Sequence, residues 1–306
     1  MTDSVSPPQA ALQLSHHFAS IVAAASRSVV AVHGRGRRPS SGIIWQPGLV
    51  VSAEETVERD AEITLTLPDG SRVEASLAGR DPSTDIAVLR FAGAATAAST
   101  PFVANAIAAD VRPGHLAVAV GRADGDVLVA LGIVSLAGPA WRSSAGGLID
   151  ARLRIDARLP VAAEGGALVT ADGALIGMSV FGPRSSVLAI PTATIERTVQ
   201  AIKDRGHIAR GYLGVALQRV PIPAGEGAET RRAAMVVSLD PTGPAKTAGI
   251  LQGDIIVGFA GVPVTGLRSL YQRLGPDMVG QRLSVELIRA GAHTTVDVTV
   301  AARPRS

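Results

Sequence analysis

Residues 61–77 read AEITLTLPDGSRVEASL, and apolar and polar residues alternate on both sides of Pro68-Asp69-Gly70. Alternation places every second side chain on one face of a strand, and Pro-Asp-Gly is typical of a tight turn. The stretch therefore predicts a β-hairpin, and its buried face carries Ile63, Leu65, Val73, Ala75 and Leu77.

Short apolar runs bounded by turn residues recur on both sides of this hairpin. Before residue 190 they predict strands at residues 29–32, 43–45, 49–52, 86–91, 116–120, 127–134 and 174–181. Further strands are predicted at residues 212–217, 235–239, 255–259, 283–288 and 295–300. Many short strands joined by turns are typical of a barrel or a sandwich, so we predict an all-β protein.

A single helix is predicted between the two groups of strands. Pro191-Thr192 opens a segment in which Ile195, Val199 and Ile202 share one helical stripe, and Gly206 closes it. A chain of 306 residues is long enough for about two domains. We therefore expect a second β-rich domain to start near Gly211.

The composition excludes several functional classes. The formal net charge is only +3, too small a basic excess to indicate nucleic-acid binding. The chain contains no cysteine, which excludes disulfides, a thiol nucleophile and a thiolate metal site. We expect no cofactor.

The amino-terminal residues do not match a secretory signal. They read MTDSVSPPQAALQLSHHF, with an acidic residue and two prolines where a signal peptide has basic residues and an apolar core. The apolar stretch at 21–32 is interrupted by Arg27 and is shorter than the ~20 residues that span a bilayer. The sequence therefore favours a cytoplasmic protein with no membrane span.

Several longer strings carry a resemblance to a known family. They are SSGIIWQPGLVVS (40–52), ITLTLPDG (63–70), GRDPSTDIAVLR (79–90), ALGIVSLAG (130–138) and ADGALIGMSV (171–180), followed by RGYLGV (210–215) and a long match at 234–264. In order and spacing they resemble the HtrA (DegP-like) serine proteases. The resemblance implies a trypsin-like (chymotrypsin-type) double β-barrel followed by a PDZ domain, a β-sandwich with short helices.

The resemblance also implies where the domains lie. We expect an N-terminal tail at 1–18 and the double barrel at 19–190, with barrel one at about 25–96 and barrel two at about 112–190. A linker helix at 191–208 and a PDZ domain at 209–303 would follow. Many family members are exported, which makes a periplasmic or extracytoplasmic location the alternative.

The family's catalytic triad maps onto this chain with two replacements. Asp85, in DPSTDIAVLR, matches the aspartate of the triad. Glu55 stands at the histidine position and Glu164 at the serine position, while Ala162 replaces a glycine of the turn that supplies the oxyanion amides. A serine mechanism requires the hydroxyl and the imidazole, so we expect no catalytic activity.

Three carboxylates would then converge in one cleft. Close carboxylates cannot all stay ionised without compensation. Glu55 and Glu164 can turn into solvent or pair with an arginine such as Arg158. Binding of Ca²⁺ or Mg²⁺, or acid–base chemistry by a carboxylate pair, are the other interpretations.

The PDZ resemblance implies a peptide-binding groove. Such a domain adds an extended peptide to a sheet edge and holds its terminal carboxylate with backbone amides. We expect the loop Tyr212-Leu213-Gly214-Val215 to hold the carboxylate, with help from Arg210. Leu267, Leu270, Tyr271 and Leu274 have helical spacing and would form the apolar wall.

The sequence thus predicts a pseudoprotease that binds peptides or unfolded proteins with apolar carboxyl termini. It would act as an adaptor, holdase or regulator in protein quality control. An active ATP-independent HtrA-type serine endopeptidase is the alternative. The family resemblance also raises a homotrimer, which the sequence leaves open.

Overall fold

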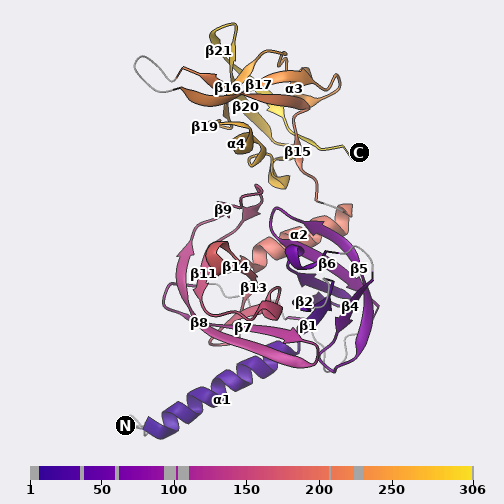
Figure 1. Ribbon diagram of the computed structural model, residues 1–306, viewed down its shortest axis with the longest axis vertical. Helices are drawn as coiled ribbons and strands as arrows, with labels where there is room; N and C mark the ends of the chain where they lie inside the picture. Colours follow the sequence, from indigo (N-terminus) through magenta and orange to yellow (C-terminus); the bar gives the residue numbers. More distant parts are fainter. Residues whose placement is uncertain are drawn as a thin grey trace. The chain divides into compact units, whose positions relative to one another are not determined.

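The computed structural model describes residues 7–34, 38–58, 62–92, 101–102, 110–206, 208–223 and 230–304. Contacts between Cα atoms divide the chain into two compact units (Figure 1). Unit 1 contains Met1–Trp141 and Ile149–Ile208, and unit 2 contains Arg142–Leu148 and Ala209–Ser306. Strands form most of the regular structure in both units, which confirms the all-β prediction. Among the described helices, none combines the length and apolar character needed to cross a membrane.

The first barrel contains the hairpin with which the sequence analysis began. Its strands close in the order β1 (Val29–His33), β2 (Ser40–Gln46), β3 (Leu49–Ser52), β6 (Ile86–Phe91), β5 (Arg72–Asp81) and β4 (Ile63–Thr66). In the hairpin Ile63 pairs with Ala75 and Leu65 with Val73. Ile63 and Leu65 are fully buried in the barrel interior, while Val73 and Ala75 pack at its edge.

The second barrel closes in the order β11 (Arg152–Asp156), β14 (Val187–Pro191), β13 (Leu175–Phe181), β12 (Ala167–Thr170), β7 (Leu116–Ala123) and β8 (Asp126–Gly138). The short β9 (Trp141–Arg142) and β10 (Leu148–Ile149) pair with each other. Two 3₁₀ turns, η3 (Val161–Ala163) and η4 (Pro183–Ser185), lie in its loops. Two closed barrels in sequence confirm the predicted double β-barrel.

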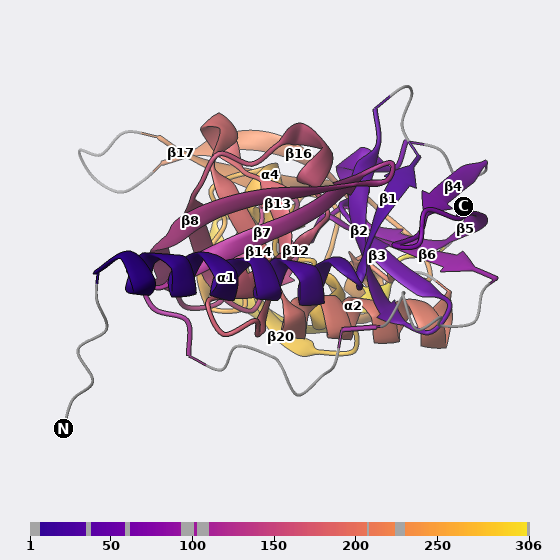
Figure 2. The same cartoon turned by 90° about the horizontal axis from the view of Figure 1, so that it is seen from below.

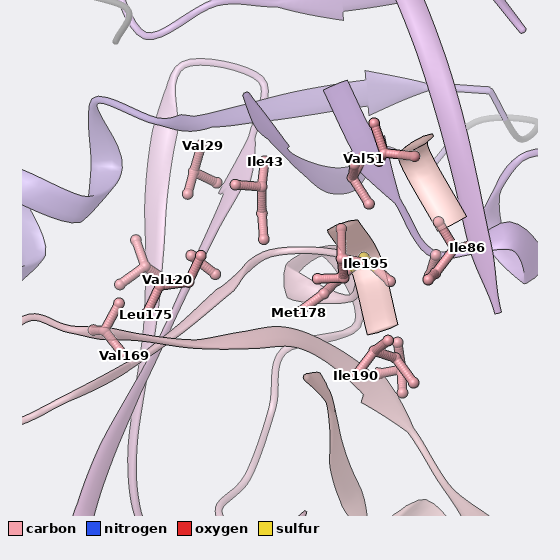
Figure 3. Close-up of a cluster of buried hydrophobic side chains, with 14 of the residues drawn as sticks. Val29, Ile43, Val51, Ile86, Val120, Val169, Leu175, Met178, Ile190 and Ile195 are labelled. Carbon is pink, nitrogen blue, oxygen red and sulfur yellow. The ribbon is translucent and has the colours of Figure 1, made fainter. Parts of the chain in front are cut away.

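One apolar cluster joins the two barrels to the helix that follows them. Figure 3 shows Val29, Ile43, Val51 and Ile86 of the first barrel with Val120, Val169, Leu175, Met178 and Ile190 of the second. Ile195 enters the same cluster from α2 (Thr192–Arg205). Gly206 ends α2 in the left-handed conformation, which glycine adopts without a steric penalty. The cluster fixes the relative position of the two barrels.

An amino-terminal helix, α1 (Pro7–Ser26), packs against β7 and β1 (Figure 2). It was not among the predicted elements, because its first turn has no acidic residue and its last turn has no basic residue. Ile21 and Ala25 are buried, whereas Leu12 and Leu14 are exposed.

A buried arginine ties the end of α1 to the barrels. Arg122 on β7 is only 4% exposed. Its Nη2 donates to the Ser26 carbonyl at 2.9 Å, its Nε to Val29 O at 2.7 Å, and its Nη1 to Gly125 O at 3.1 Å. Burial lowers the pKa of this guanidinium. The three carbonyls compensate for its removal from water.

Unit 2 contains a sheet in the order β16 (Val215–Ile222), β17 (Arg231–Leu239), β18 (Ile255–Phe259), β20 (Arg282–Arg289) and β21 (Ala292–Thr299). β19 (Val262–Pro263) pairs with β18, and β15 (Gly211–Tyr212) pairs with β22 (Ala301–Ala302). Two short helices, α3 (Pro244–Thr247) and α4 (Leu267–Tyr271), and the 3₁₀ turn η5 (Pro276–Met278) complete the unit. β16 is an outer strand of this sheet, and within residues 208–223 and 230–304 no strand pairs with its outer edge, so this free edge can pair with another chain segment.

A loop from within the sequence of the second barrel, between β8 and β11, belongs to unit 2. Residues 142–148 group with residues 209–306. Arg142 forms a bidentate ion pair with Asp277, with distances of 3.1 and 2.5 Å. Gln272 Nε2 donates to Ser144 O at 2.7 Å. Nothing in the sequence pattern predicted this association.

Candidate functional site

Asp85 lies in the turn between β5 and β6, and local hydrogen bonds hold that turn. The Asp81 carboxylate accepts from the Ser83 amide at 2.9 Å, the Ser83 hydroxyl at 2.6 Å and the Thr84 hydroxyl at 2.8 Å. Asp85 itself has a positive φ of 57°. The turn before β6 thus uses the Asp, Ser and Thr side chains of the DPSTD sequence as hydrogen-bonding groups.

The Asp85 carboxylate faces the turn η1 (Glu54–Thr56). Its Oδ1 accepts the Glu55 amide at 3.0 Å, and its carbonyl accepts the Glu54 amide at 3.4 Å. Burial, together with the negative charges of Glu55 and Glu164, raises the pKa of Asp85 to about 7. The amide hydrogen bonds oppose this rise, because they stabilise the ionised form.

Glu164 follows η3 and is only 7% exposed. Its Oε1 accepts the Phe181 amide of β13 at 3.1 Å, and its carbonyl accepts the Ser41 amide at 2.8 Å. The Ala162 carbonyl accepts the Ser41 hydroxyl at 2.6 Å. Gly165 follows at φ 84°, where an added Cβ would lie 2.2 Å from Ser41 O. The turn containing Glu164 is thus anchored to β2 of the first barrel.

The structure brings the three predicted carboxylates together, and it gives each a different environment. Asp85 is partly buried, Glu164 is buried and bonded to an amide, and Glu55 is exposed. Arg158 is exposed. The neighbouring Glu54 forms an ion pair with Arg80 at 3.0 Å, which the sequence analysis missed. Glu55 is exposed, as expected, whereas Glu164 does not turn into solvent, because it is buried and accepts the Phe181 amide.

The chemistry of this cluster is limited to carboxyl groups. Asp85, with a pKa of about 7, can exchange a proton near neutral pH. In the described ranges, no group of three or more His, Cys, Asp or Glu is arranged to hold a metal ion. Neither a hydroxyl nor an imidazole is contributed by Asp85, Glu55 or Glu164.

A groove of about 320 Å³ lies in unit 2. It is lined by Arg210, Gly211, Tyr212, Leu213, Gly214, Val215, Leu217, Leu270, Tyr271, Leu274 and Arg303. These include every predicted groove residue except Leu267, which packs against the core instead. Gly211, Leu217 and Arg303 were missed. Arg303 is far from the loop in sequence, so only strand pairing could have located it.

The backbone of the groove loop is oriented by hydrogen bonds on its inner side. The Leu213 carbonyl accepts the Ala245 amide at 2.8 Å, and the Gly214 carbonyl accepts the Asp240 amide at 2.8 Å. In a trans peptide the carbonyl and the following N–H point in opposite directions. The amides of Gly214 and Val215 therefore point away from Ala245 and Asp240.

Gly214 is required by backbone geometry. Its φ is 75°, and an added Cβ would lie 2.9 Å from the Cα of Gly243. A side chain at this position would therefore strain the turn behind the loop.

The Tyr212 side chain is fixed beside the loop. Its hydroxyl donates to Asp240 Oδ2 at 3.0 Å, and this hydrogen bond raises the pKa of Tyr212. Asp240 also accepts the amide and the hydroxyl of Thr242, both at 2.9 Å.

Two family models match the chain, and together they cover both units. Residues 40–178 match the trypsin-like peptidase domain, and residues 211–300 match the PDZ domain. The chain is 33% identical over 284 residues to a probable periplasmic serine endoprotease DegP-like of Brucella suis, with 89% of this chain and 54% of the relative covered. A protein of the same name in Rickettsia conorii is 29% identical, with 81% of this chain and 51% of the relative covered. The chain thus spans about half the length of the curated relatives it matches.

Solved structures give the same fold. The serine endoprotease from Yersinia pestis has a TM-score of 0.68 and 27% identity, with 94% of this chain and 98% of that chain covered. The HtrA-type protease AlgW with a decapeptide also has a TM-score of 0.68, at 24% identity, with 94% of this chain and 99% of that chain covered. A double barrel followed by a PDZ domain defines an HtrA-type architecture. This chain belongs to the HtrA/DegP-like family of serine proteases.

Two expectations from the sequence are corrected by these comparisons. The expectation that the chain is not an enzyme is wrong, because its relatives are named serine endoproteases, which supports the alternative of protease activity. The cytoplasmic location is also wrong, because the curated relatives are named periplasmic. Amino-terminal residues without a recognisable signal were an insufficient basis for that location.

Proposed function

We propose that this chain binds polypeptides with apolar carboxyl ends through the groove of its PDZ domain, in protein quality control. The main support for this proposal is that the free edge of β16 lies beside an apolar groove. The amides of Gly214 and Val215 in the adjoining loop point away from the interior. A peptide can add to this edge as a further strand. Its carboxylate would meet the Gly214 and Val215 amides.

The groove supports an apolar preference for the last residue of the peptide. Leu213, Leu270 and Leu274 line it and also belong to the buried core of unit 2, so they form a preorganised apolar surface. Polar side chains would lose hydration there without gaining hydrogen bonds. We expect micromolar affinity, about 8 kcal/mol, because ordering a flexible peptide offsets much of the contact energy.

Calorimetric titration of the full chain tests this function. A short peptide ending in valine should bind, and its amidated form should bind at least about tenfold more weakly, because it lacks the charge that the amides accept. A third peptide ending in aspartate controls for apolar preference. Equal affinity for acid and amide would contradict carboxylate recognition. The full chain is required, since unit 2 includes residues 142–148.

Serine endopeptidase activity is the second candidate function, because the curated relatives carry that name. Its chemistry needs an activated hydroxyl, which the three carboxylates do not supply. The reacting serine would have to lie at another position. Labelling with a fluorophosphonate and mapping of the modified peptide tests this candidate. A labelled serine supports it, and no label under conditions that label trypsin counts against it.

The residue assignments that go with the family remain proposals. We propose that Asp85 occupies the position of the triad aspartate, Glu55 the histidine position, Glu164 the serine position and Ala162 the oxyanion turn. The convergence of Glu55 and Glu164 on Asp85 supports this alignment. We also propose the domain limits 19–190, 191–208 and 209–303, action as an adaptor, holdase or regulator, and the periplasmic location that the relatives' names indicate.

A further inference from the structure

The groove in unit 2 has a second arginine that its own loop does not contain. β22 pairs with β15 so that Gly211 lies opposite Ala302 and Tyr212 opposite Ala301. The next residue, Arg303, donates its amide to the Arg210 carbonyl at 2.8 Å. This pairing places Arg303 beside Arg210, directly before the loop that would hold the carboxylate.

Both arginines line the groove, and no Asp or Glu lines it with them. Within the described residues, neither guanidinium forms an ion pair. Other arginines of unit 2 do: Arg142 pairs with Asp277, and Arg289 pairs with Asp254. The groove therefore has two positive charges with no counter-charge of its own.

The nearest acidic group beside the loop is already engaged. Asp240 accepts hydrogen bonds from the Tyr212 hydroxyl and from the amide and hydroxyl of Thr242. Asp240 raises the pKa of Tyr212, and the positive charge of Arg303 lowers it. Arg303 is therefore close enough to interact electrostatically with Tyr212. Arg303 thus acts at the same end of the groove as Tyr212, where the loop amides lie.

We propose that Arg303, acting with Arg210, is a specificity-determining residue that recognises the terminal carboxylate of the bound peptide. This inference rests on the proposed peptide binding. Two guanidinium groups at one end attract an anion and favour a free carboxyl terminus over an internal segment. Because both side chains are exposed, salt weakens their attraction.

The test is a cycle of two changes, measured by calorimetry on the full chain at low and at high salt. One change is Arg303→Gln, and the other is amidation of a peptide ending in valine. Arg303→Gln should weaken binding of the free acid about three- to tenfold at low salt and leave binding of the amide unchanged. The loss should shrink at high salt, and Arg303→Lys should restore most of the affinity.

Arg232→Gln is the matched control, because Arg232 is exposed on β17, away from the β16 edge, and does not line the groove. It should change neither affinity. Equal loss for acid and amide, or no loss for either, would overturn the role of Arg303 while leaving peptide binding intact. If the unmodified chain binds neither peptide, the proposed function and this inference both fail. Unchanged thermal unfolding of each variant shows that the fold is retained.

Discussion

Replacing Asp85 with asparagine should stabilise the barrel unit at pH 8. Burial and two neighbouring charges raise the pKa of Asp85 from 3.8 to about 7. Between these values the native state holds a proton that the unfolded state has released. Stability therefore falls as the pH rises from about 4 to 7, and the loss is complete above the folded pKa.

The size of the effect follows from the same shift. A shift of one pKa unit corresponds to about 1.4 kcal/mol. The raised pKa of Asp85 therefore sets an upper limit of about 4 kcal/mol on the stability lost above pH 7. Part of it comes from Glu55, which is exposed and screened by solvent. We expect about 2 to 4 kcal/mol more stability for Asp85→Asn than for the unmodified chain at pH 8, and little difference at pH 4.

Urea unfolding followed by tryptophan fluorescence measures this difference. Trp45 and Trp141, the two tryptophans of the chain, both belong to unit 1, so the signal reports on the barrels and not on the PDZ domain. Asp156→Asn, at an exposed position of β11, is the control and should follow the unmodified chain. If Asp85→Asn and the unmodified chain lose stability in parallel from pH 4 to 8, the reasoning is refuted.

Three further changes test other parts of the structure. Arg122→Leu should lower the free energy of unfolding of unit 1 by about 3 kcal/mol, because one buried and two partly buried carbonyls lose a charged donor; a loss below 1 kcal/mol in urea unfolding would show that these hydrogen bonds contribute little. Gly214→Ala should destabilise unit 2 by about 1 to 3 kcal/mol and so lower its melting temperature, through strain at the positive φ and the contact with Gly243; an unchanged melting temperature argues against that explanation. A double-mutant cycle of Arg142→Ala with Asp277→Asn should give a coupling energy of about 1 kcal/mol, and additive effects would show that the ion pair contributes nothing.

Local sequence pattern predicted the parts of the fold that depend on local signals. The hairpin at 63–77 formed in the expected register because alternation and the Pro68-Asp69-Gly70 turn agree. The expectation that Tyr212 and Leu213 line the groove came from the family resemblance of the string RGYLGV, and that for Leu274 came from helical spacing, although Leu274 lies after the end of α4. A short sequence motif predicts the position of a side chain when the whole motif lies within one strand, turn or helix.

Features that depend on tertiary pairing could not be predicted. From sequence alone Arg122 would be predicted to lie on the surface, yet it is buried beside α1. The sequence of the loop at 142–148 likewise gives no indication that it groups with unit 2. Arg303 enters the groove only through the pairing of β15 with β22. The hydrogen bond from the Phe181 amide to Glu164 joins β13 to the turn after η3 in the same way. Long-range contacts of this kind leave no periodic signal in the sequence.

The carboxylate loop, residues 212–215, is central to the proposed peptide binding, and backbone NMR of the full chain can observe it. Addition of a peptide with an apolar, free carboxyl terminus should move the amide proton resonances of Gly214 and Val215 downfield, as expected for charge-assisted hydrogen bonds. The amidated peptide should produce a much smaller change at these two amides. If the free acid leaves both resonances in place, or shifts residues outside the groove instead, the peptide-binding account is contradicted.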